Sequence, residues 1–245
     1  MIEASTRLVG LLGQPVSGSL SPRMQNAAFA ARGLDWTYVA LEVAPEALPE
    51  AVRGLAALGF AGANVTMPHK TAVAELCDEL DELSREARAV NTLVFRDGQT
   101  KGFNTDGPAV VSAVVISPGA RALVLGRGGA ARVVALALAN AGADVRAASR
   151  SDPDWPPDGA DAAILVNATP VRDELLAEPR RNQQVVDLAY ARGAAPTALV
   201  AAARAAGCET VVDGAEILVR QGAASFELWT GVPAPIEVMR AAVSR

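Results

Sequence analysis

The sequence predicts an α/β protein made of two domains, each built on a mostly parallel sheet. Short apolar strands alternate with amphipathic helices over the first third of the chain. The same alternation begins again after the break at Ser117-Pro118-Gly119. A helical pattern from Glu216 to the end, interrupted at Gly231-Val232-Pro233, indicates a helical tail.

The first alternating segment begins with a buried strand and a turn at Gly13–Gly18. Ser21-Pro22 then opens a helix, because serine is a good N-cap and proline fits the first helical turn. A hairpin is expected around Arg96–Gln99. The expected elements are strands at Arg7–Leu12, Trp36–Val43, Ala61–Val65, Thr92–Phe95 and Thr100–Phe103, and helices at Ser21–Ala31, Pro49–Leu58 and Gly107–Ile116.

The second segment repeats the pattern with less room between its strands. Eleven residues separate Ser151 from Ala163 and three of them are proline, so a full helix does not fit there. We expect one domain of residues 1–106 together with 214–245, and a trimmed domain of residues 107–213. The strands expected in the second domain are Arg121–Leu125, Val145–Ala148, Ala163–Val166, Val185–Leu188 and Thr210–Val212, with a helix to about Ala141 after the first.

The composition excludes several classes of function. A net charge of −5 and a pI of about 5.0 argue against nucleic acid or an anionic membrane as the main partner. No stretch reaches the roughly 20 apolar residues that span a bilayer, and no signal peptide is recognisable. Two distant cysteines and a single histidine cannot assemble a zinc cluster. A cytoplasmic protein without a metal is expected.

A glycine loop between a strand and a helix predicts a Rossmann-like dinucleotide-binding domain. In Gly126-x-Gly128-x-x-Ala131, the first glycine allows a tight turn and the second lets the backbone approach a pyrophosphate. The N-terminus of the helix that follows the loop then offers free N–H groups to the phosphates. The alternative is an ordinary tight turn.

The residues after the next strand favour NADP over NAD. An NAD site expects an acidic residue at that strand end. The sequence there is Ser149-Arg150-Ser151, and a guanidinium flanked by hydroxyls suits a 2′-phosphate. Arg127, inside the glycine loop, adds a second candidate cation. The alternative for both arginines is a solvated position in a loop.

Lys70 is a candidate acid–base group. Of 22 basic residues only Lys70 and Lys101 are lysine, and lysine can lose its proton where arginine cannot. Lys70 follows the strand that carries Asn64 and Thr66 on one face, and it is expected to open a helix, whose positive dipole end disfavours an ammonium. His69 is expected to face away from Lys70. The alternative is an isolated surface lysine.

Other polar clusters are ambiguous from the residues alone. Asp106 either caps the helix that begins at Gly107 or takes part in a site. Asn91 lies beside the predicted hairpin, where such residues usually close turns. Ser19 and Ser21 either cap a helix or bind a carboxylate.

Taken together, these segments resemble the shikimate dehydrogenase family, in family order and over nearly the whole chain. The matching motifs are Gly13-Gln14-Pro15-Val16 to Ser19-Leu20-Ser21-Pro22, Asn64-Val65-Thr66-x-Pro68-x-Lys70, Ala89-Val90-Asn91-Thr92, Gly102-Phe103-Asn104-Thr105-Asp106, Gly126-x-Gly128-Gly129-Ala130, Asn167-Ala168-Thr169-Pro170, Asp187-x-x-Tyr190, and Gln221-Gly222-Ala223 through Phe226-x-x-Trp229-x-Gly231.

The resemblance implies reversible hydride transfer between NADPH and 3-dehydroshikimate, within the chorismate pathway of aromatic amino acid biosynthesis. Lys70 and Asp106 would be the catalytic pair, and the last helices would pack back on an N-terminal substrate domain. The implied substrate-binding residues are Ser19, Ser21, Asn64, Thr66, Asn91, Tyr190 and Gln221. The implied cofactor-binding residues are Glu82, Gly126, Arg127, Gly128, Gly129, Ala130, Ser149, Arg150, Ser151, Leu188 and Gly214.

The departures from the family pattern cluster around the cofactor, where Arg127 and Ser149-Arg150-Ser151 replace the family's usual residues. Quinate or aminoshikimate as the substrate, and a nucleotide-binding relative without turnover, are the competing hypotheses. Retention of both Lys70 and Asp106 argues against the latter, because a protein that only binds needs neither. A monomer or a homodimer is expected.

Overall fold

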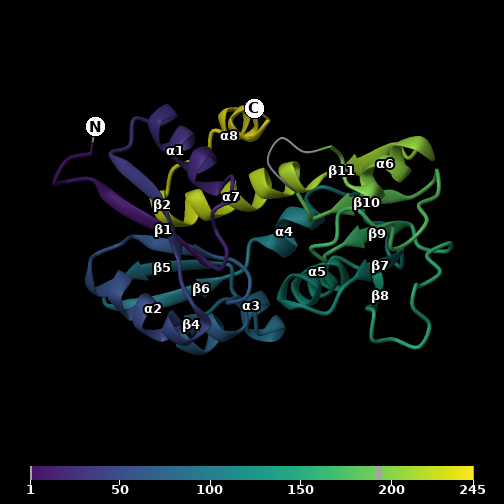
Figure 1. The fold of residues 1–245 in the computed structure, drawn as a ribbon, viewed down its shortest axis with the longest axis horizontal. Helices are drawn as coiled ribbons and strands as arrows, with labels where there is room; N and C mark the ends of the chain where they lie inside the picture. Colours follow the sequence, from purple (N-terminus) through teal and green to yellow (C-terminus); the bar gives the residue numbers. More distant parts are fainter. Residues whose placement is uncertain (1, 191–194, 245) are drawn as a thin grey trace. The chain divides into compact units, whose positions relative to one another are not determined.

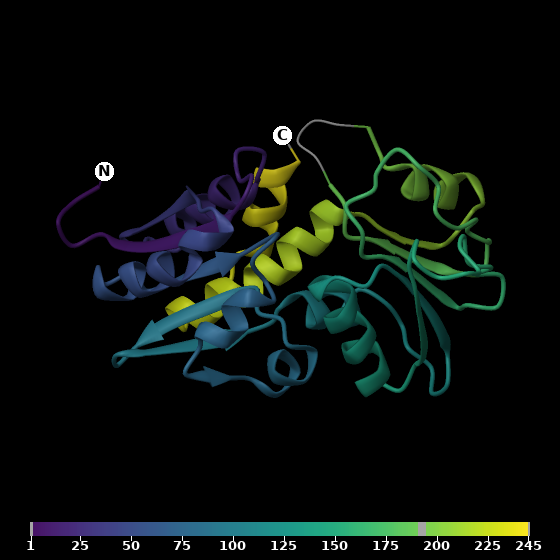
Figure 2. The ribbon, with the colours of Figure 1, turned by 60° about the horizontal axis from the view of Figure 1, so that its bottom comes forward.

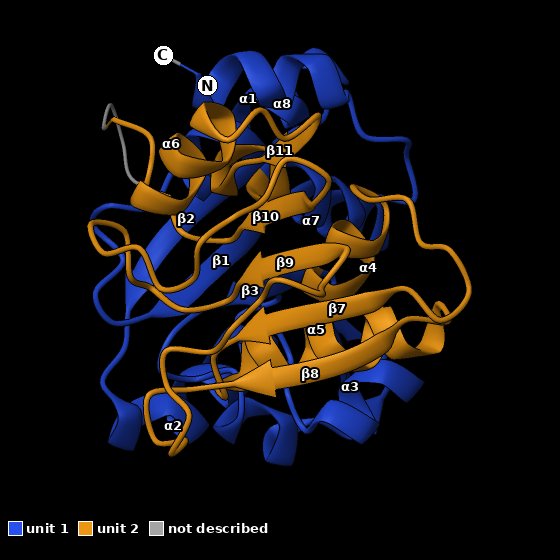
Figure 3. Cartoon of the chain, turned by 90° about the vertical axis from the view of Figure 1, so that its right-hand side faces the viewer, with its two compact units in different colours: residues 1–105, 219–245 blue, residues 106–218 orange. Residues whose placement is uncertain are grey.

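A computed structural model describes residues 2–190 and 195–244. The chain divides into two compact units, residues 1–105 with 219–245 and residues 106–218, which Figure 3 shows in blue and orange. The sequence-based boundaries were 106/107 and 213/214. The chain crosses from one unit to the other twice, between Thr105 and Asp106 and between Leu218 and Val219.

Unit 1 contains a six-stranded mixed sheet in the order β2-β1-β3-β5-β6-β4. β1, β2 and β3 run parallel, and β5 and β6 form an antiparallel hairpin that joins β3 through β5. Its turn, Asp97-Gly98, has positive φ at both residues, as a type I′ hairpin requires. The elements are β1 (Arg7–Gly13), α1 (Ser21–Ala31), β2 (Trp36–Glu42), η1 (Pro45–Ala47), α2 (Leu48–Ala57), β3 (Gly62–Val65), η2 (Ala72–Leu76), β4 (Glu79–Leu80), α3 (Glu82–Ala87), β5 (Thr92–Arg96), β6 (Gln99–Phe103) and α8 (Ile236–Val243).

Alternation along β3 shows how the layers of unit 1 form. Ala63 and Val65 face the apolar side chains of α2, which cover one face of the sheet. Gly62 and Asn64 face α7 (Gly214–Thr230), the long yellow-green helix of Figures 1 and 2. The residues of α7 from 219 onward belong to unit 1. Gly62 is required here, because an added Cβ would lie 2.4 Å from the indole nitrogen of Trp229.

Unit 2 contains a five-stranded parallel sheet in the order β11-β10-β9-β7-β8. Side chains of α4 and α5 cover one face around Val124 and Val166. The other face, around Leu123 and Leu165, is covered by α6 and by connecting segments. The elements are α4 (Asp106–Val111), β7 (Arg121–Leu125), α5 (Gly129–Asn140), β8 (Asp144–Ala148), β9 (Ile164–Asn167), β10 (Gln184–Asp187), α6 (Ala198–Ala205) and β11 (Thr210–Val212).

The predicted α/β class with mostly parallel strands is confirmed, and three local predictions are wrong. α4 ends at Val111 rather than Ile116, because Ser112 Oγ donates to Ala109 O and β-branched residues follow. Ser21 is the first residue of α1, and the N-cap position is Leu20. Lys70 opens no α-helix: the next element is the five-residue 3₁₀ helix η2, which starts at Ala72.

The trimmed second domain is visible in the structure. Residues 149–163, all of which the structure describes, contain no helix between β8 and β9. β8 is an edge strand of its sheet. Within the described residues, no helix has the length and apolar character needed to cross a membrane.

Candidate functional site

Polar segments of unit 1 meet at one edge of its sheet. Because β1 and β3 are parallel, the segments that follow them, which carry Ser19–Ser21 and Thr66–Lys70, leave at the same edge. β5 is antiparallel to β3, so Asn91, directly before it, lies at that edge too. Phe103 pairs with Thr92, and the chain therefore also leaves β6 there before Asp106. The topology thus gathers most of the predicted substrate residues.

A buried hydrogen-bond network connects the core of this edge. Asn91 is 2% exposed, and its Oδ1 accepts from the Thr105 N–H at 2.9 Å and the Thr92 hydroxyl at 3.0 Å. Its Nδ2 donates to Thr105 Oγ1 at 2.9 Å and lies 3.4 Å from Gln221 Oε1. The side chains of Asn91 and Gln221, 130 residues apart in sequence, are therefore brought together.

Asn64 is held by the protein on all sides of its amide. Its Oδ1 accepts from the Tyr38 hydroxyl at 2.9 Å. Its Nδ2 faces Ser225 Oγ at 3.0 Å, Thr92 Oγ1 at 3.1 Å and the Asn91 carbonyl oxygen at 3.2 Å. An amide nitrogen has two hydrogens, so these three acceptors already engage its donor capacity.

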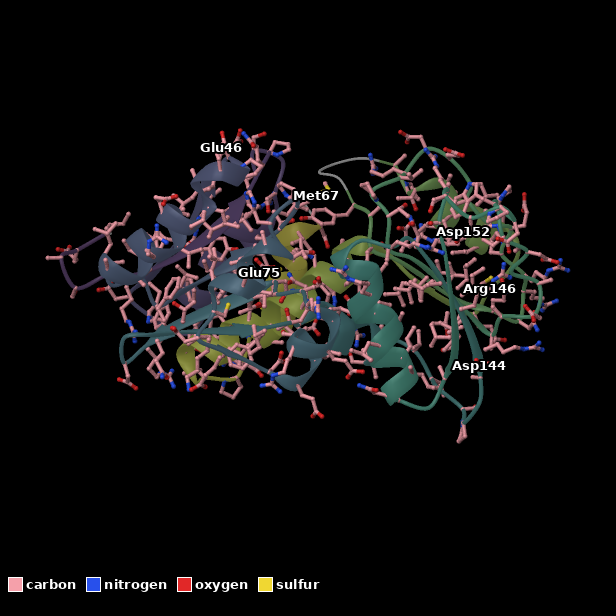
Figure 4. All side chains as sticks on the ribbon, turned by 90° about the horizontal axis from the view of Figure 1, so that it is seen from below. Glu46, Met67, Glu75, Asp144, Arg146 and Asp152 are labelled. Carbon is pink, nitrogen blue, oxygen red and sulfur yellow. The ribbon has the colours of Figure 1, made fainter. Side chains whose placement is uncertain are left out.

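The two serines after β1 lie at the start of α1. Ser21 is 6% exposed, while Ser19 is half-buried and its Oγ accepts from the Ser21 N–H at 3.2 Å. The close approach of β1 to the next loop explains Gly13, since an added Cβ would lie 2.3 Å from Thr66 Cγ2. Thr66 itself is half-buried beside the exposed Met67, which Figure 4 labels.

Lys70 and His69 differ sharply in environment. His69 is 1% exposed, and its Nε2 lies 2.7 Å from the carbonyl oxygen of Val43. Lys70 is half-buried, and its carbonyl oxygen accepts from the Val90 N–H at 2.8 Å. That bond ties the Lys70 turn to the segment that carries Asn91. Burial and the contact with the Val43 backbone therefore explain the presence of His69 without a catalytic role.

The predicted catalytic residue Asp106 and the predicted substrate residue Tyr190 lie in unit 2. Asp106 is 6% exposed and is the first residue of α4. Tyr190 is half-buried and directly precedes residues 191–194, which lie outside the described part of the chain.

The carboxyl ends of the parallel strands in unit 2 form a second convergence. Leu125 of β7 pairs with Ala148 of β8 on one side and with Asn167 of β9 on the other. The glycine loop therefore lies where successive strands diverge to opposite sides, the point at which open α/β sheets bind ligands.

The glycine loop fits a bound pyrophosphate. Gly126 has a φ of +122°, which only glycine adopts readily. Gly128, the N-cap of α5, has an ordinary φ of −68°, and an added Cβ would meet nothing within 4 Å. Packing in the protein therefore does not require glycine there, and the backbone is open to the approach of a ligand. Gly129 and Ala130 begin the twelve-residue α5, and the first N–H groups of a helix can bind an anion.

The candidate 2′-phosphate residues are paired with acids. Arg127 forms an ion pair with Asp152, and Arg150 forms one with Glu174. Ser149 and Ser151 contact each other through their hydroxyls at 2.8 Å. The Ser149 N–H donates to Asp152 Oδ2 at 2.8 Å. Asp152 was not among the cofactor residues predicted from the sequence.

Three other predicted cofactor residues lie outside the glycine loop and the turn after β8. Glu82 is exposed at the start of α3 in unit 1. Leu188 is half-buried after β10, and Gly214 is buried at the start of α7. An added Cβ on Gly214 would lie 2.5 Å from the Ala189 carbonyl oxygen, so packing alone explains this glycine.

Asp187 organises the loops at the edge of unit 2. It is fully buried and accepts from Asn167 Nδ2 at 2.9 Å, the Ala189 N–H at 2.9 Å and the Thr197 hydroxyl at 2.5 Å. Burial raises the pKa of its carboxyl, and these hydrogen bonds offset part of the effect. Among the described residues, no group of three or more His, Cys, Asp or Glu side chains is placed to hold a metal ion.

Comparisons with known proteins show which family the chain resembles. Residues 11–93 match the family model of the shikimate dehydrogenase substrate binding domain, and residues 214–243 match that of the shikimate 5'-dehydrogenase C-terminal domain. The chain is similar to a shikimate 5-dehydrogenase from Thermus thermophilus, solved in complex with NADP(H) and shikimate, with a TM-score of 0.88 and 33% identity over 98% of this chain and 99% of that one.

Curated relatives match over nearly their whole length. A shikimate dehydrogenase (NADP(+)) from an Anaeromyxobacter species is 46% identical over 278 residues, covering 100% of this chain and 98% of the relative. Its counterpart from Methanopyrus kandleri is 42% identical over 282 residues, covering 99% and 96%. Both alignments exceed the 245 residues of this chain, so the relatives carry segments that it lacks. The identity and coverage show that the chain belongs to the shikimate dehydrogenase family.

Proposed function

We propose that this protein is an NADP-dependent shikimate dehydrogenase, an oxidoreductase of aromatic amino acid biosynthesis. The observation that carries the proposal is the gathering of Ser19–Ser21, Thr66–Lys70 and Asn91 at one sheet edge, in a chain that also has a glycine loop fitted for a pyrophosphate. The names of relatives at 42% and 46% identity point to the same activity.

In this proposal Lys70 is the general acid–base group and Asp106 is its partner. NADPH, when bound, supplies a hydride to the carbonyl carbon of 3-dehydroshikimate. Lys70 donates a proton to the carbonyl oxygen as negative charge builds there, and it removes the hydroxyl proton in the reverse reaction. Asp106 orients the Lys70 ammonium and binds a ring hydroxyl.

The proposed binding roles follow the chemistry of each side chain. Ser19 and Ser21 donate hydroxyl hydrogens to the substrate carboxylate, and Thr66 and Asn91 bind ring hydroxyls. Gln221 reaches the same ring from α7, where its amide already lies beside Asn91. Asn64 supports this set from within the protein, since its amide hydrogens are engaged there. Tyr190 is the last member of the proposed substrate-binding set.

The proposed cofactor site is formed mainly by the loops of unit 2. The backbone of the glycine loop and the first turn of α5 would hold the pyrophosphate, and Arg127 and Arg150 would hold the 2′-phosphate. The full proposed set is Glu82, Gly126, Arg127, Gly128, Gly129, Ala130, Ser149, Arg150, Ser151, Leu188 and Gly214.

A spectrophotometric screen tests the function directly. The purified protein is assayed at 340 nm with NADP⁺ or NAD⁺ against shikimate and quinate. Turnover of shikimate with NADP⁺ is expected to have the highest kcat/KM. A higher kcat/KM with quinate would transfer the assignment to quinate dehydrogenase. Nucleotide binding without turnover of either substrate would contradict the enzymatic proposal.

A further inference from the structure

The side chain of Asp152 lies next to the end of β8, although Asp152 follows the last residue of that strand by four positions. Residues 149–152 form a tight turn, in which the Asp152 N–H donates to the Ser149 carbonyl oxygen at 2.9 Å. In the same turn Asp152 Oδ2 accepts from the Ser149 N–H at 2.8 Å. The Asp152 side chain, labelled in Figure 4, is only 14% exposed, and this hydrogen bond fixes its carboxylate to the turn.

The end of β8 corresponds to the position at which dinucleotide-binding domains contact the adenosine ribose. In doubly wound folds, an acid at the end of the strand after the glycine loop binds the ribose 2′-hydroxyl, and an arginine there accommodates a 2′-phosphate. Here β8 is that strand, and its last residue, Ala148, pairs with Leu125 directly before the glycine loop. Asp152 therefore places an acid beside the candidate phosphate-binding arginines.

The charges at this end of unit 2 are balanced within the protein. The Arg127 guanidinium is held by Asp152, and the Arg150 guanidinium is held by Glu174. A 2′-phosphate carries a charge of about −1.5 to −2. To bind both arginines it must displace or share two carboxylates. Of these, Asp152 is the less exposed, at 14% against 58% for Glu174, and it is also fixed to the backbone.

We propose that Asp152 is a specificity-determining residue that weakens the preference for a 2′-phosphorylated adenosine over an unphosphorylated one. It acts in two ways: it competes with the phosphate for Arg127, and it offers an acceptor to a free 2′-hydroxyl. This inference rests on the proposed function, because it assumes that the glycine loop binds a dinucleotide. It predicts measurable use of NAD by this chain beside NADP.

The test measures binding of two ligand fragments by isothermal titration calorimetry. Adenosine 2′,5′-bisphosphate and 5′-AMP differ only in the 2′-phosphate and need no turnover. In Asp152→Asn, the amide oxygen still accepts from the Ser149 N–H, so the turn is kept while the charge is removed. The ratio of the 5′-AMP Kd to the bisphosphate Kd should rise by about three- to tenfold, as expected for loss of one competing surface charge.

Asp161→Asn is the matched control. It removes the same charge from another ion pair of unit 2, Arg121–Asp161, and Arg121 lies at the opposite end of β7 from the glycine loop. Its ratio should equal that of the wild type. A ratio for Asp152→Asn that stays within error of Asp161→Asn would overturn the inference. Failure of the wild type to bind either fragment or NADP⁺ would instead contradict the proposed function.

Thermal unfolding separates a loss of structure from a change in selectivity. The melting temperature of Asp152→Asn should lie close to that of the wild type. If it falls strongly, Asp152→Ser supplies the second variant, because a serine hydroxyl also accepts a hydrogen bond in such turns. A folded Asp152→Ser variant with an unchanged ratio would overturn the inference equally.

Discussion

Ser225 on α7 and Thr92 at the start of β5 are joined by a hydrogen bond of 2.8 Å between their hydroxyl oxygens, across 133 residues of sequence. Ser225 Oγ also accepts from Asn64 Nδ2. One fully buried hydroxyl therefore couples α7 to the sheet edge that carries Asn91. Gln221, one turn earlier on α7, is positioned by the same attachment.

Ser225→Ala should accordingly weaken substrate binding more than chemistry. The change leaves Asn64 and Thr92 with fewer partners and costs about 1–2 kcal/mol in the free energy of unfolding. We expect the KM for shikimate to rise severalfold while kcat stays within about twofold. Ser244→Ala is the matched control, because Ser244 also donates to the carbonyl oxygen four residues earlier but is exposed. A large loss of kcat with unchanged KM would contradict this assignment.

Ser21→Ala offers a clean test of carboxylate binding. Because Ser21 is not the N-cap of α1, alanine there removes no helix cap and should leave the melting temperature nearly unchanged. The KM for shikimate should rise, as it should for Ser19→Ala and Gln221→Ala, with a smaller effect on kcat. Steady-state kinetics at saturating NADP⁺ measure this. An unchanged KM in a folded Ser21→Ala variant would remove this serine from the proposed site.

Much of the fold, and less of the site, could be predicted from the sequence. Strand Arg121–Leu125, helix Ser21–Ala31 and the hairpin turn follow from apolar periodicity and turn residues, which are local signals. The roles of Ser225 and Tyr38 depend on partners far away in sequence, and no local pattern marks a serine that will meet Asn64. Asp152 was missed because the turn that brings its carboxylate back to Ser149 is a backbone feature. Its Asp-Pro sequence signals only a loop.

Asp187→Asn should change how stability depends on pH. Burial raises the pKa of this carboxyl above its ordinary value of 3.8, so the folded state binds the proton more tightly than the unfolded state. In the wild type, the protonated Asp187 side chain makes its full contribution to the free energy of unfolding below pH 3.8. That contribution is lost as pH rises through the pKa of the folded state. Asparagine cannot ionise and keeps an acceptor for Asn167 and Ala189.

The free energy of unfolding in urea, measured between pH 4 and pH 7, tests this behaviour. The variant should gain relative to the wild type as pH rises, with the change confined to the interval above 3.8. Asp161→Asn, an exposed and ion-paired aspartate of the same unit, is the control. A difference between wild type and Asp187→Asn that is constant across this range would show that Asp187 ionises normally in the folded protein.

Trp229→Phe should destabilise unit 1 without touching the proposed site. The indole N–H donates to the Leu93 carbonyl oxygen at 2.9 Å in a buried position, and phenylalanine leaves that carbonyl oxygen without its donor. The expected cost is about 1–3 kcal/mol in the free energy of unfolding, measured with urea. Trp36→Phe, whose ring packs beside Phe29 and is only half-buried, should cost less. Equal costs would show that the hydrogen bond contributes little.

Replacement of Lys70 by arginine separates charge from proton transfer. The structure holds the Lys70 turn against the Asn91 segment through the backbone, so its side chain can be changed without breaking that attachment. General acid–base catalysis contributes about 10²- to 10⁴-fold in rate, so Lys70→Ala should lower kcat by at least about 10²-fold while NADPH still binds. Lys70→Arg should fail to a similar extent, because a guanidinium keeps the positive charge but does not give up its proton. The measurement is kcat in both directions, with NADPH binding followed by fluorescence as the check on folding.

Lys101→Arg, the same substitution at a lysine that pairs with Glu79 on the β4–β6 side of the sheet, should keep wild-type activity. If Lys70→Arg retains most of the wild-type kcat, charge alone suffices and Lys70 does not transfer the proton.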